Sequence, residues 1–195
     1  HDTEMNFWFY HSDDNTYGYS YGIGGSGVFL NSNNLANPEI PLNGYDYLTI
    51  AHEIVHNLGI SHPFDGYANF PEVSSPLDIG KQSANQNIYT ITSYNDIGTT
   101  TKEGIKINPP YRTGQLDFGL SSLGTIDQSF LQILYGENDN NNNNTVYILD
   151  GNKLGAPWTT IWDTGGVDTI EIQSTSIEDA YINLQPANFQ TNSDT

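Results

Sequence analysis

One segment organises the chain, and it reads His52-Glu53-Ile54-Val55-His56-Asn57-Leu58-Gly59-Ile60-Ser61-His62-Pro63. Residues four apart on an α-helix lie on the same side, so His52 and His56 are expected to point the same way. Gly59 permits a sharp turn after the helix, because glycine adopts backbone conformations that other residues avoid. That turn is expected to bring His62 back beside the first two histidines.

Three neutral imidazoles with an open fourth position are typical of a catalytic zinc site. Glu53 lies on the flank of the same helical face, where it can reach a metal-bound water without being a ligand. A helix with surface histidines is one alternative interpretation. A closed structural metal site is another, but it needs a fourth protein ligand and leaves Glu53 without a role.

Hydrophobic periodicity predicts two helices. The first, at about 45–58, carries the histidine segment and is expected to stop at Gly59. The second, at about 126–135, begins at residues with capping-box spacing, Thr125 and Gln128, and ends before Gly136. Short strands are expected at 5–10, 17–30, 145–149, 159–162, 169–172 and 180–184.

The amino-acid composition and the expected secondary structure change along the chain, and this change predicts the domain organisation. An asparagine-rich stretch at 138–144 separates a mixed α/β part from a part that contains only short strands and turns. We therefore expect one unit over residues 1–137 and a second, β-rich unit over residues 138–195.

Composition excludes several classes of partner. The chain has 195 residues, no cysteine, and 23 acidic against 5 basic side chains, which gives a net charge of −18. Nucleic acid and anionic membranes repel such a polyanion, so neither is expected as a partner. The absence of cysteine excludes disulfides and thiolate metal sites. No apolar run is long enough to span a membrane, and no leader opens the sequence, so a signal peptide is absent or already removed.

The segment 52–63 has the H-E-x-x-H-x-x-G-x-x-H pattern of the metzincin metallopeptidases, and its Ser-His-Pro ending resembles the serralysin family. Further segments resemble that family in order between about residues 26 and 190. They are Tyr89-Thr90-Ile91-Thr92-Ser93-Tyr94, where the family has a turn ending in Met-Ser-Tyr, Leu134-Tyr135-Gly136, Thr145-Val146-Tyr147, Trp162-Asp163-Thr164-Gly165-Gly166-Val167-Asp168-Thr169 and Ile182-Asn183-Leu184.

This resemblance implies an α+β fold, in which a metzincin-like catalytic unit precedes the start of a β-rich calcium-binding unit. The catalytic unit would consist of a twisted sheet and the zinc-motif helix. By resemblance, His52, His56 and His62 bind zinc and Glu53 is the general base. Tyr94 resembles the tyrosine that ligates zinc at rest and stabilises the oxyanion during reaction, with a core tyrosine as the alternative.

Two further sites are implied by the resemblance. Ser26, Gly27, Val28 and Phe29 resemble the edge strand that pairs with an extended peptide substrate, with an ordinary sheet strand as the alternative. A calcium site is implied near the glycine-rich turn, with a polar hairpin turn as the alternative. Its candidate ligands are Asp163, Gly165, Gly166, Asp168, Asn141, Asn143 and Thr145.

The function implied is that of a secreted, extracellular zinc metalloendopeptidase that hydrolyses internal peptide bonds. Its partners would be protein or peptide substrates and a protein inhibitor, and it would be a monomer. Two departures from the family pattern leave alternatives open. Thr92 stands where the family has an apolar methionine beneath the metal, and a buried threonine hydroxyl needs a partner. The segment before the zinc helix is also short, so a catalytically decayed binding or adhesion module and an inactive fragment of a longer peptidase are both alternatives.

Overall fold

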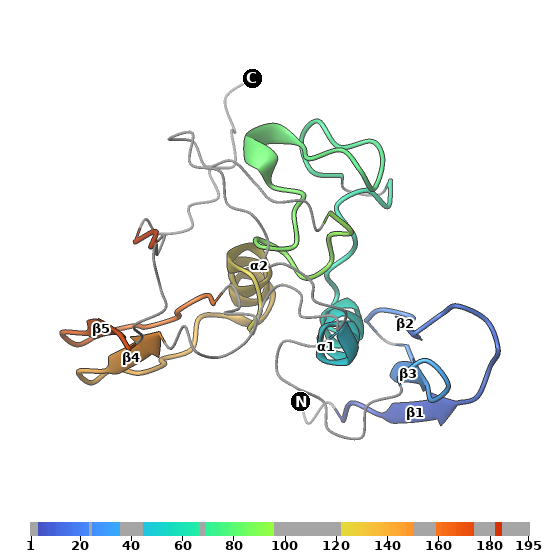
Figure 1. Cartoon of the computed structure of the whole chain (residues 1–195), viewed down its shortest axis with the longest axis horizontal. Helices are drawn as coiled ribbons and strands as arrows, with labels where there is room; N and C mark the ends of the chain where they lie inside the picture. The colour runs from blue at the N-terminus through green and yellow to red at the C-terminus, as the bar shows by residue number, and fades with distance from the viewer. Residues whose placement is uncertain are drawn as a thin grey trace.

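The computed structural model describes residues 4–23, 25–35, 45–66, 69–95, 122–149, 159–173 and 182–184. These residues form two α-helices, one short 3₁₀ helix and two small sheets, which is an α+β arrangement. Helix α1 (Tyr45–Asn57) lies between a three-stranded sheet and helix α2 (Thr125–Tyr135), as Figure 1 shows. The second sheet lies beyond α2, and the 3₁₀ helix η1 (Lys81–Ser83) is part of the loop between the two α-helices.

The first sheet contains β1 (Phe7–Tyr10), β2 (Gly18–Ser20) and β3 (Val28–Asn31) in the order β1-β3-β2. Strand β3 is parallel to β1 and antiparallel to β2, so it is hydrogen-bonded along both edges. The prediction of an edge strand at Val28 and Phe29 is therefore wrong. Within the described residues, the strand that pairs on one side only and lies against α1 is β2.

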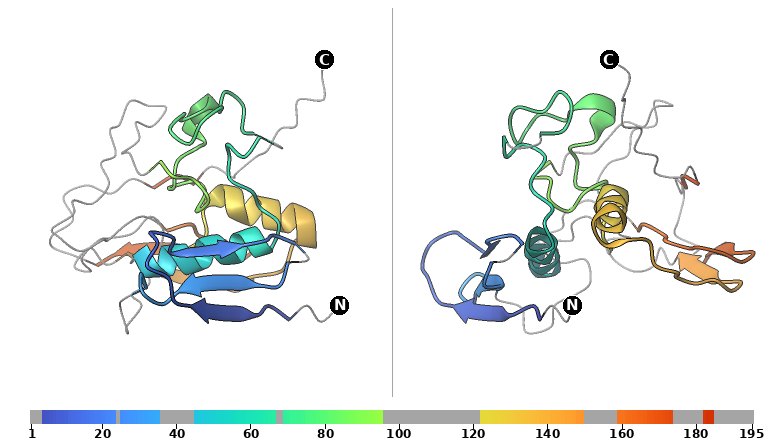
Figure 2. Two further views of the ribbon diagram at one scale, coloured as in Figure 1. Left: turned by 90° about the vertical axis from the view of Figure 1, so that its right-hand side faces the viewer. Right: turned by 180° about the vertical axis from the view of Figure 1, so that it is seen from behind.

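Helix α1 packs on the sheet through alternating residues of β3. Val28 and Leu30 are almost completely buried, and they share one face of the strand because successive side chains point to opposite faces. The left view of Figure 2 shows α1 running alongside the strands of this sheet. The opposite side of α1 contributes Val55 to a core with Ile60 and Ile91. Side chains that pack around this core are Leu48, Ala51, Leu123, Phe130 and Leu131.

The end of α1 confirms the predicted glycine stop. The Ile60 amide donates to the Val55 carbonyl at 3.2 Å, and the Gly59 amide donates to the His56 carbonyl at 2.9 Å. Gly59 has a φ of 101°, and a Cβ at this position would lie 2.3 Å from Ile23 Cδ1. A left-handed residue at this point lets the chain reverse without a side-chain clash.

Helix α2 occurs where predicted, but its cap differs. The N-cap residue is Gly124, and the Gly124 amide donates to Asp127 at 2.9 Å. The capping box predicted at Thr125 and Gln128 is therefore wrong by one residue. Asp127, which provides this capping contact, is completely buried.

The second sheet consists of β4 (Val146–Leu149) and β5 (Thr169–Ile172), which pair in parallel. Both strands were predicted, whereas the predicted strand at 159–162 is wrong because these residues are irregular. Residues 182–184 are also irregular, and the rest of the predicted strand at 180–184 lies outside the described residues. Among the described helices, none is long and apolar enough to cross a membrane.

Candidate metal centre

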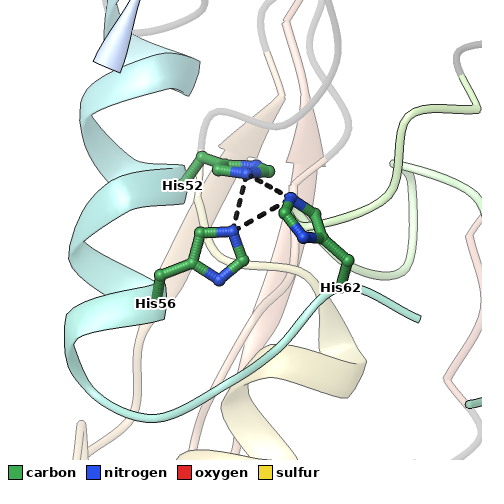
Figure 3. Close-up of side chains that lie close together, drawn as sticks. All are labelled: His52, His56 and His62. Atoms are coloured by element: carbon green, nitrogen blue, oxygen red, sulfur yellow. Dashed lines mark hydrogen bonds between the residues drawn. The ribbon is translucent and has the colours of Figure 1, made fainter. Parts of the chain in front are cut away.

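The three histidines of the segment 52–63 converge as predicted. His52 and His56 project from successive turns of α1, and His62 approaches from the loop after it (Figure 3). The Nε2 atoms of His52 and His56 are 2.9 Å apart, and each lies 3.1 Å from Nε2 of His62. Together they form a group that can hold a metal ion.

The second ring nitrogen of every histidine faces a hydrogen-bond acceptor. His52 Nδ1 lies 2.8 Å from the Ile91 carbonyl, and His56 Nδ1 lies 2.6 Å from the Ile60 carbonyl. His62 Nδ1 lies 2.9 Å and 3.1 Å from the two carboxylate oxygens of Asp65. These acceptors place the proton on Nδ1 in each ring, so each Nε2 presents a lone pair to the other two.

Three lone pairs at this separation repel one another unless a cation lies among them. Every Nε2–Nε2 distance is shorter than twice a zinc–nitrogen bond of roughly 2.0–2.1 Å, so one ion can contact all three atoms. The donor set is neutral imidazole, which suits zinc and other borderline transition metals. Burial also lowers the pKa of His52 to about 3, with a smaller effect from His56, and burial lowers the pKa of His56. The residues present therefore fit a zinc ion.

Glu53 lies on α1 immediately after the first histidine and is buried, with 7% of its surface exposed. Burial raises the pKa of its carboxyl group to about 7. Strand β2 approaches closely at this point, because a Cβ on Gly18 would lie 3.0 Å from Glu53 Cγ. A carboxyl group with a pKa near neutrality can both accept and return a proton at physiological pH.

Tyr94 lies beside the triad but remains accessible, with 55% of its surface exposed. Its ring centroid is 4.9 Å from that of His62 and 5.8 Å from that of His52. Phe64 packs 5.1 Å from the same ring. The tyrosine is therefore adjacent to the metal site, and the alternative of a core tyrosine is excluded by its exposure.

An open cleft of about 370 Å³ runs along one side of the triad. One wall is the chain leaving β2, at Ser20, Tyr21, Gly22 and Ile23. The other wall comes from the end of α1 and the following turn, at His56, Gly59, Ile60, Ser61, His62 and Asp65. An extended chain that lies in this cleft, between the chain leaving β2 and the end of α1, would therefore pass the triad.

Sequence reasoning missed the residues that orient the histidines. Asp65 follows the third histidine by three residues, and a carboxylate at this spacing is a signal that the sequence did contain. The carbonyls of Ile60 and Ile91 carried no such signal, because any residue supplies a backbone carbonyl. The requirement for a partner at Thr92 is confirmed, since this buried hydroxyl lies 2.8 Å from the Thr90 hydroxyl.

The residues predicted to bind calcium are brought together, because the loops 140–145 and 162–168 lie side by side. The Thr164 amide donates to the Asn140 carbonyl, and the Thr145 amide donates to Asp168. Gly166 packs against Asn143, where a Cβ would lie 2.6 Å from the carbonyl oxygen.

The carboxylate of Asp163, however, already accepts hydrogen bonds from the Gly165 amide and the Tyr147 hydroxyl. The Asn141 side chain also donates to that hydroxyl, at 3.1 Å. A polar hairpin-like arrangement accounts for these contacts without an ion, so calcium at this place stays a prediction.

Histidines on a helix and the following turn, with a buried glutamate after the first, form the kind of centre that metzincin metallopeptidases possess. No protein-family model matches the chain. The chain is, however, similar to several curated serralysins, which confirms the resemblance predicted from its motifs.

Three relatives illustrate the extent of that similarity. The chain is 33% identical over 175 residues to a serralysin of Photorhabdus luminescens, with 81% of this chain and 32% of the relative aligned. It is 29% identical over 204 residues to a serralysin of Proteus mirabilis, with 97% and 38% aligned. It is 28% identical over 184 residues to metallopeptidase AprA of Pseudomonas marginalis, with 88% and 36% aligned. The chain thus spans about a third of the length of these relatives.

Proposed function

We propose that this chain is the zinc-dependent catalytic part of a metalloendopeptidase of the serralysin type. The observation that carries the proposal is the triad geometry. Three Nε2 atoms converge within 3.1 Å while every Nδ1 is bound to an acceptor. The names of the relatives support the same reaction class.

In this proposal His52, His56 and His62 hold the zinc ion, which when bound supplies a Lewis acid for the scissile carbonyl and for the attacking water. Glu53 takes a proton from that water at its carboxylate and passes the proton to the leaving amine. The burial of Glu53 supports this role, because it raises the pKa of the carboxyl group to about 7 in the metal-free protein and so favours uptake of a proton. The Tyr94 hydroxyl donates a hydrogen bond to the oxyanion that develops on the substrate.

The substrate is an extended protein or peptide chain that binds in the cleft between β2 and the end of α1. Backbone pairing requires a free strand edge, and β3 has none because both of its edges are paired. We therefore assign substrate pairing to β2 rather than to Ser26, Gly27, Val28 and Phe29. Ser20 belongs both to this strand and to the cleft wall, which supports the assignment.

Further parts of the proposal rest on the resemblance to serralysins. The protein is secreted and monomeric, and a protein inhibitor recognises the cleft. Calcium binds between the loops 140–145 and 162–168, whose proximity supports a shared site. The boundary between the peptidase unit and the β-rich unit falls near residue 137.

The replacement Glu53→Ala tests the assigned chemistry. The variant is expected to retain zinc in elemental analysis and to lose casein hydrolysis, because only the proton carrier is removed. A variant that still cleaves casein would show that another group is the base. If the wild-type protein contains no zinc after purification at neutral pH, that result would instead favour a non-catalytic binding module.

A further inference from the structure

A buried polar network joins the segment 90–92, which contacts His52, to the start of helix α2. Thr90, Thr92 and Asp127 are each completely buried. The Thr90 hydroxyl donates to Asp127 Oδ1 at 2.6 Å, and Asp127 Oδ2 accepts from the amides of Ile91 at 2.8 Å and Gly124 at 2.9 Å. The carboxylate thus ties the segment 90–92 to the start of α2.

The direction of each hydrogen bond in this network can be assigned. A hydroxyl has one proton and two acceptor positions, and the single proton of Thr90 is used by Asp127. The Thr92 hydroxyl, 2.8 Å away, must therefore donate to Thr90 Oγ1. The Thr92 amide also approaches that oxygen, at 3.3 Å. Thr90 Oγ1 is then fully satisfied, with one bond donated and two accepted.

This arrangement reaches the metal centre through a single peptide unit. The amide of Thr92 and the carbonyl of Ile91 belong to the same planar group, so fixing one end fixes the other. Thr90 Oγ1 holds the amide end, and the carbonyl end accepts from His52 Nδ1 at 2.8 Å. The preceding peptide is held by the other oxygen of the same carboxylate, because the Ile91 amide donates to Asp127 Oδ2.

We infer that the Thr92 hydroxyl is a positioning group for the metal ligand His52, acting through Thr90, Asp127 and the peptide between Ile91 and Thr92. This inference rests on the proposed zinc function. It replaces the interpretation of Thr92 as a defect in an apolar floor, because the hydroxyl supplies a hydrogen bond to Thr90 Oγ1 that an apolar side chain would remove. A methionine at position 92 is expected to weaken the site in this chain.

Matched replacements at position 92 separate the hydroxyl from the rest of the side chain. Thr92→Val keeps the shape and removes the hydroxyl, whereas Thr92→Ser keeps the hydroxyl. Removing a direct hydrogen-bond partner of a metal ligand typically weakens metal binding by roughly 10–100-fold. The Thr92 hydroxyl acts through Thr90 and one peptide unit, so we expect the lower end of this range, about tenfold, for Thr92→Val. Thr92→Ser is expected to bind zinc within about threefold of the wild type, and Thr92→Met to bind less tightly than the wild type.

The assay is competition for zinc between each purified protein and a chelating indicator at pH 7.5, together with the visible absorption bands of the cobalt-loaded proteins. Circular dichroism of the metal-free proteins verifies that each variant is folded. Thr169→Val, an exposed threonine in β5, is the control and is expected to leave both readouts unchanged. If Thr92→Val does not fold, the pair Thr92→Ala and Thr92→Ser provides the same comparison, because both lack the methyl group and only one has the hydroxyl.

Equal zinc affinity in Thr92→Val and the wild type would overturn the inference, as would tighter binding by Thr92→Met or an equal loss in Thr92→Ala and Thr92→Ser. These results are distinct from a failure of the proposed function. A wild-type protein that binds zinc but cleaves no peptide bond would refute the peptidase while leaving the positioning role measurable. A wild-type protein that binds no zinc would refute both.

Discussion

The hydrogen bond between Asp65 and His62 predicts a measurable share of the zinc affinity. Asp65 accepts from His62 Nδ1 at 2.9 Å and 3.1 Å and also from the His62 amide at 3.0 Å, so it fixes both the ring and the backbone of this ligand. We expect Asp65→Asn to weaken zinc binding, because the amide keeps one acceptor oxygen and loses the negative charge. Asp65→Ala removes both contacts and is expected to weaken binding further.

The magnitude follows from the exposure of the pair. A hydrogen bond to a charged group contributes about 1.5–3 kcal/mol, and a difference of about 1.4 kcal/mol corresponds to a tenfold change in affinity. The Asp65 side chain is 37% exposed, so water screens its charge and the lower end of that range applies. Asp65→Asn should therefore weaken zinc binding about tenfold, within the range seen when partners of ligating histidines are removed.

Zinc affinity would be measured by competition with a chelating indicator at pH 7.5 and two ionic strengths. The matched control is Asp78→Asn, because this carboxylate accepts from Ser74 and Ser75 in a turn and binds none of the three histidines. Unchanged affinity in Asp65→Asn, together with unchanged affinity in the control, would refute the argument that Asp65 orients His62. A loss that disappears at high salt would show that Asp65 acts by long-range charge instead.

Three further results are expected. In the metal-free protein Glu53→Gln should raise the free energy of unfolding by about 3 kcal/mol at pH 8, because folding raises the pKa of Glu53 from 4.5 to about 7. This gain should shrink as the pH falls from 7 to 4.5, and urea unfolding that shows a gain growing as the pH falls over this range would contradict the prediction. Gly124→Ala should destabilise the fold by about 2–3 kcal/mol in thermal unfolding, because a Cβ there would lie 2.1 Å from the Tyr89 carbonyl oxygen. The control Gly165→Ala should show no such loss, because the atom nearest to its added Cβ is 3.5 Å away. Tyr94→Phe should lower kcat by about 10²-fold with little change in KM, and steady-state kinetics that show a rise in KM alone would assign Tyr94 to substrate binding.

The sequence predicted the parts of the fold that depend on local patterns. The histidine spacing, the glycine stop and helical periodicity all concern residues within one or two turns of each other, and α1 ends as expected. The predicted helix at 126–135 was also correct, yet its cap was not. Gly124 has no side chain to mark it as an N-cap, and Asp127 supplies the contact from inside the helix.

The order of strands in the sheet could not be predicted in the same way. Both β2 and β3 have residues suited to strands, and the sequence does not state which of them has a free edge. The answer depends on β1, which pairs in parallel with β3 and so places β3 in the centre. Pairing between segments that are separated along the chain left no local trace at Val28 or Phe29.

The same reasoning explains why the orienting groups escaped prediction. Thr90 and Asp127 are ordinary residue types, and their importance arises only when α2 packs against the segment 90–92. Comparison with the serralysin pattern showed only that position 92 lacks the family's methionine. The structure shows instead what is present there, a hydroxyl with a partner inside a satisfied network.

The metal centre depends on three separate parts of the fold at once. The acceptor for His56 lies in the turn that ends α1, the acceptor for His62 lies in the following loop, and the acceptor for His52 lies in the segment that α2 holds. Each part by itself orients one ring. The three lone pairs converge only when all three parts are folded, so metal binding and folding are expected to be coupled.

A bound metal ion would also change the electrostatic balance at the candidate site. Burial lowers the pKa of His52 to about 3 and raises that of Glu53 to about 7, so the folded chain disfavours charge on both residues. A cation held by the triad favours the ionised form of Glu53 and is attracted by the lone pairs that otherwise repel each other. One ion thus offsets both unfavourable features, and zinc is expected to stabilise the fold in addition to favouring the ionised form of Glu53.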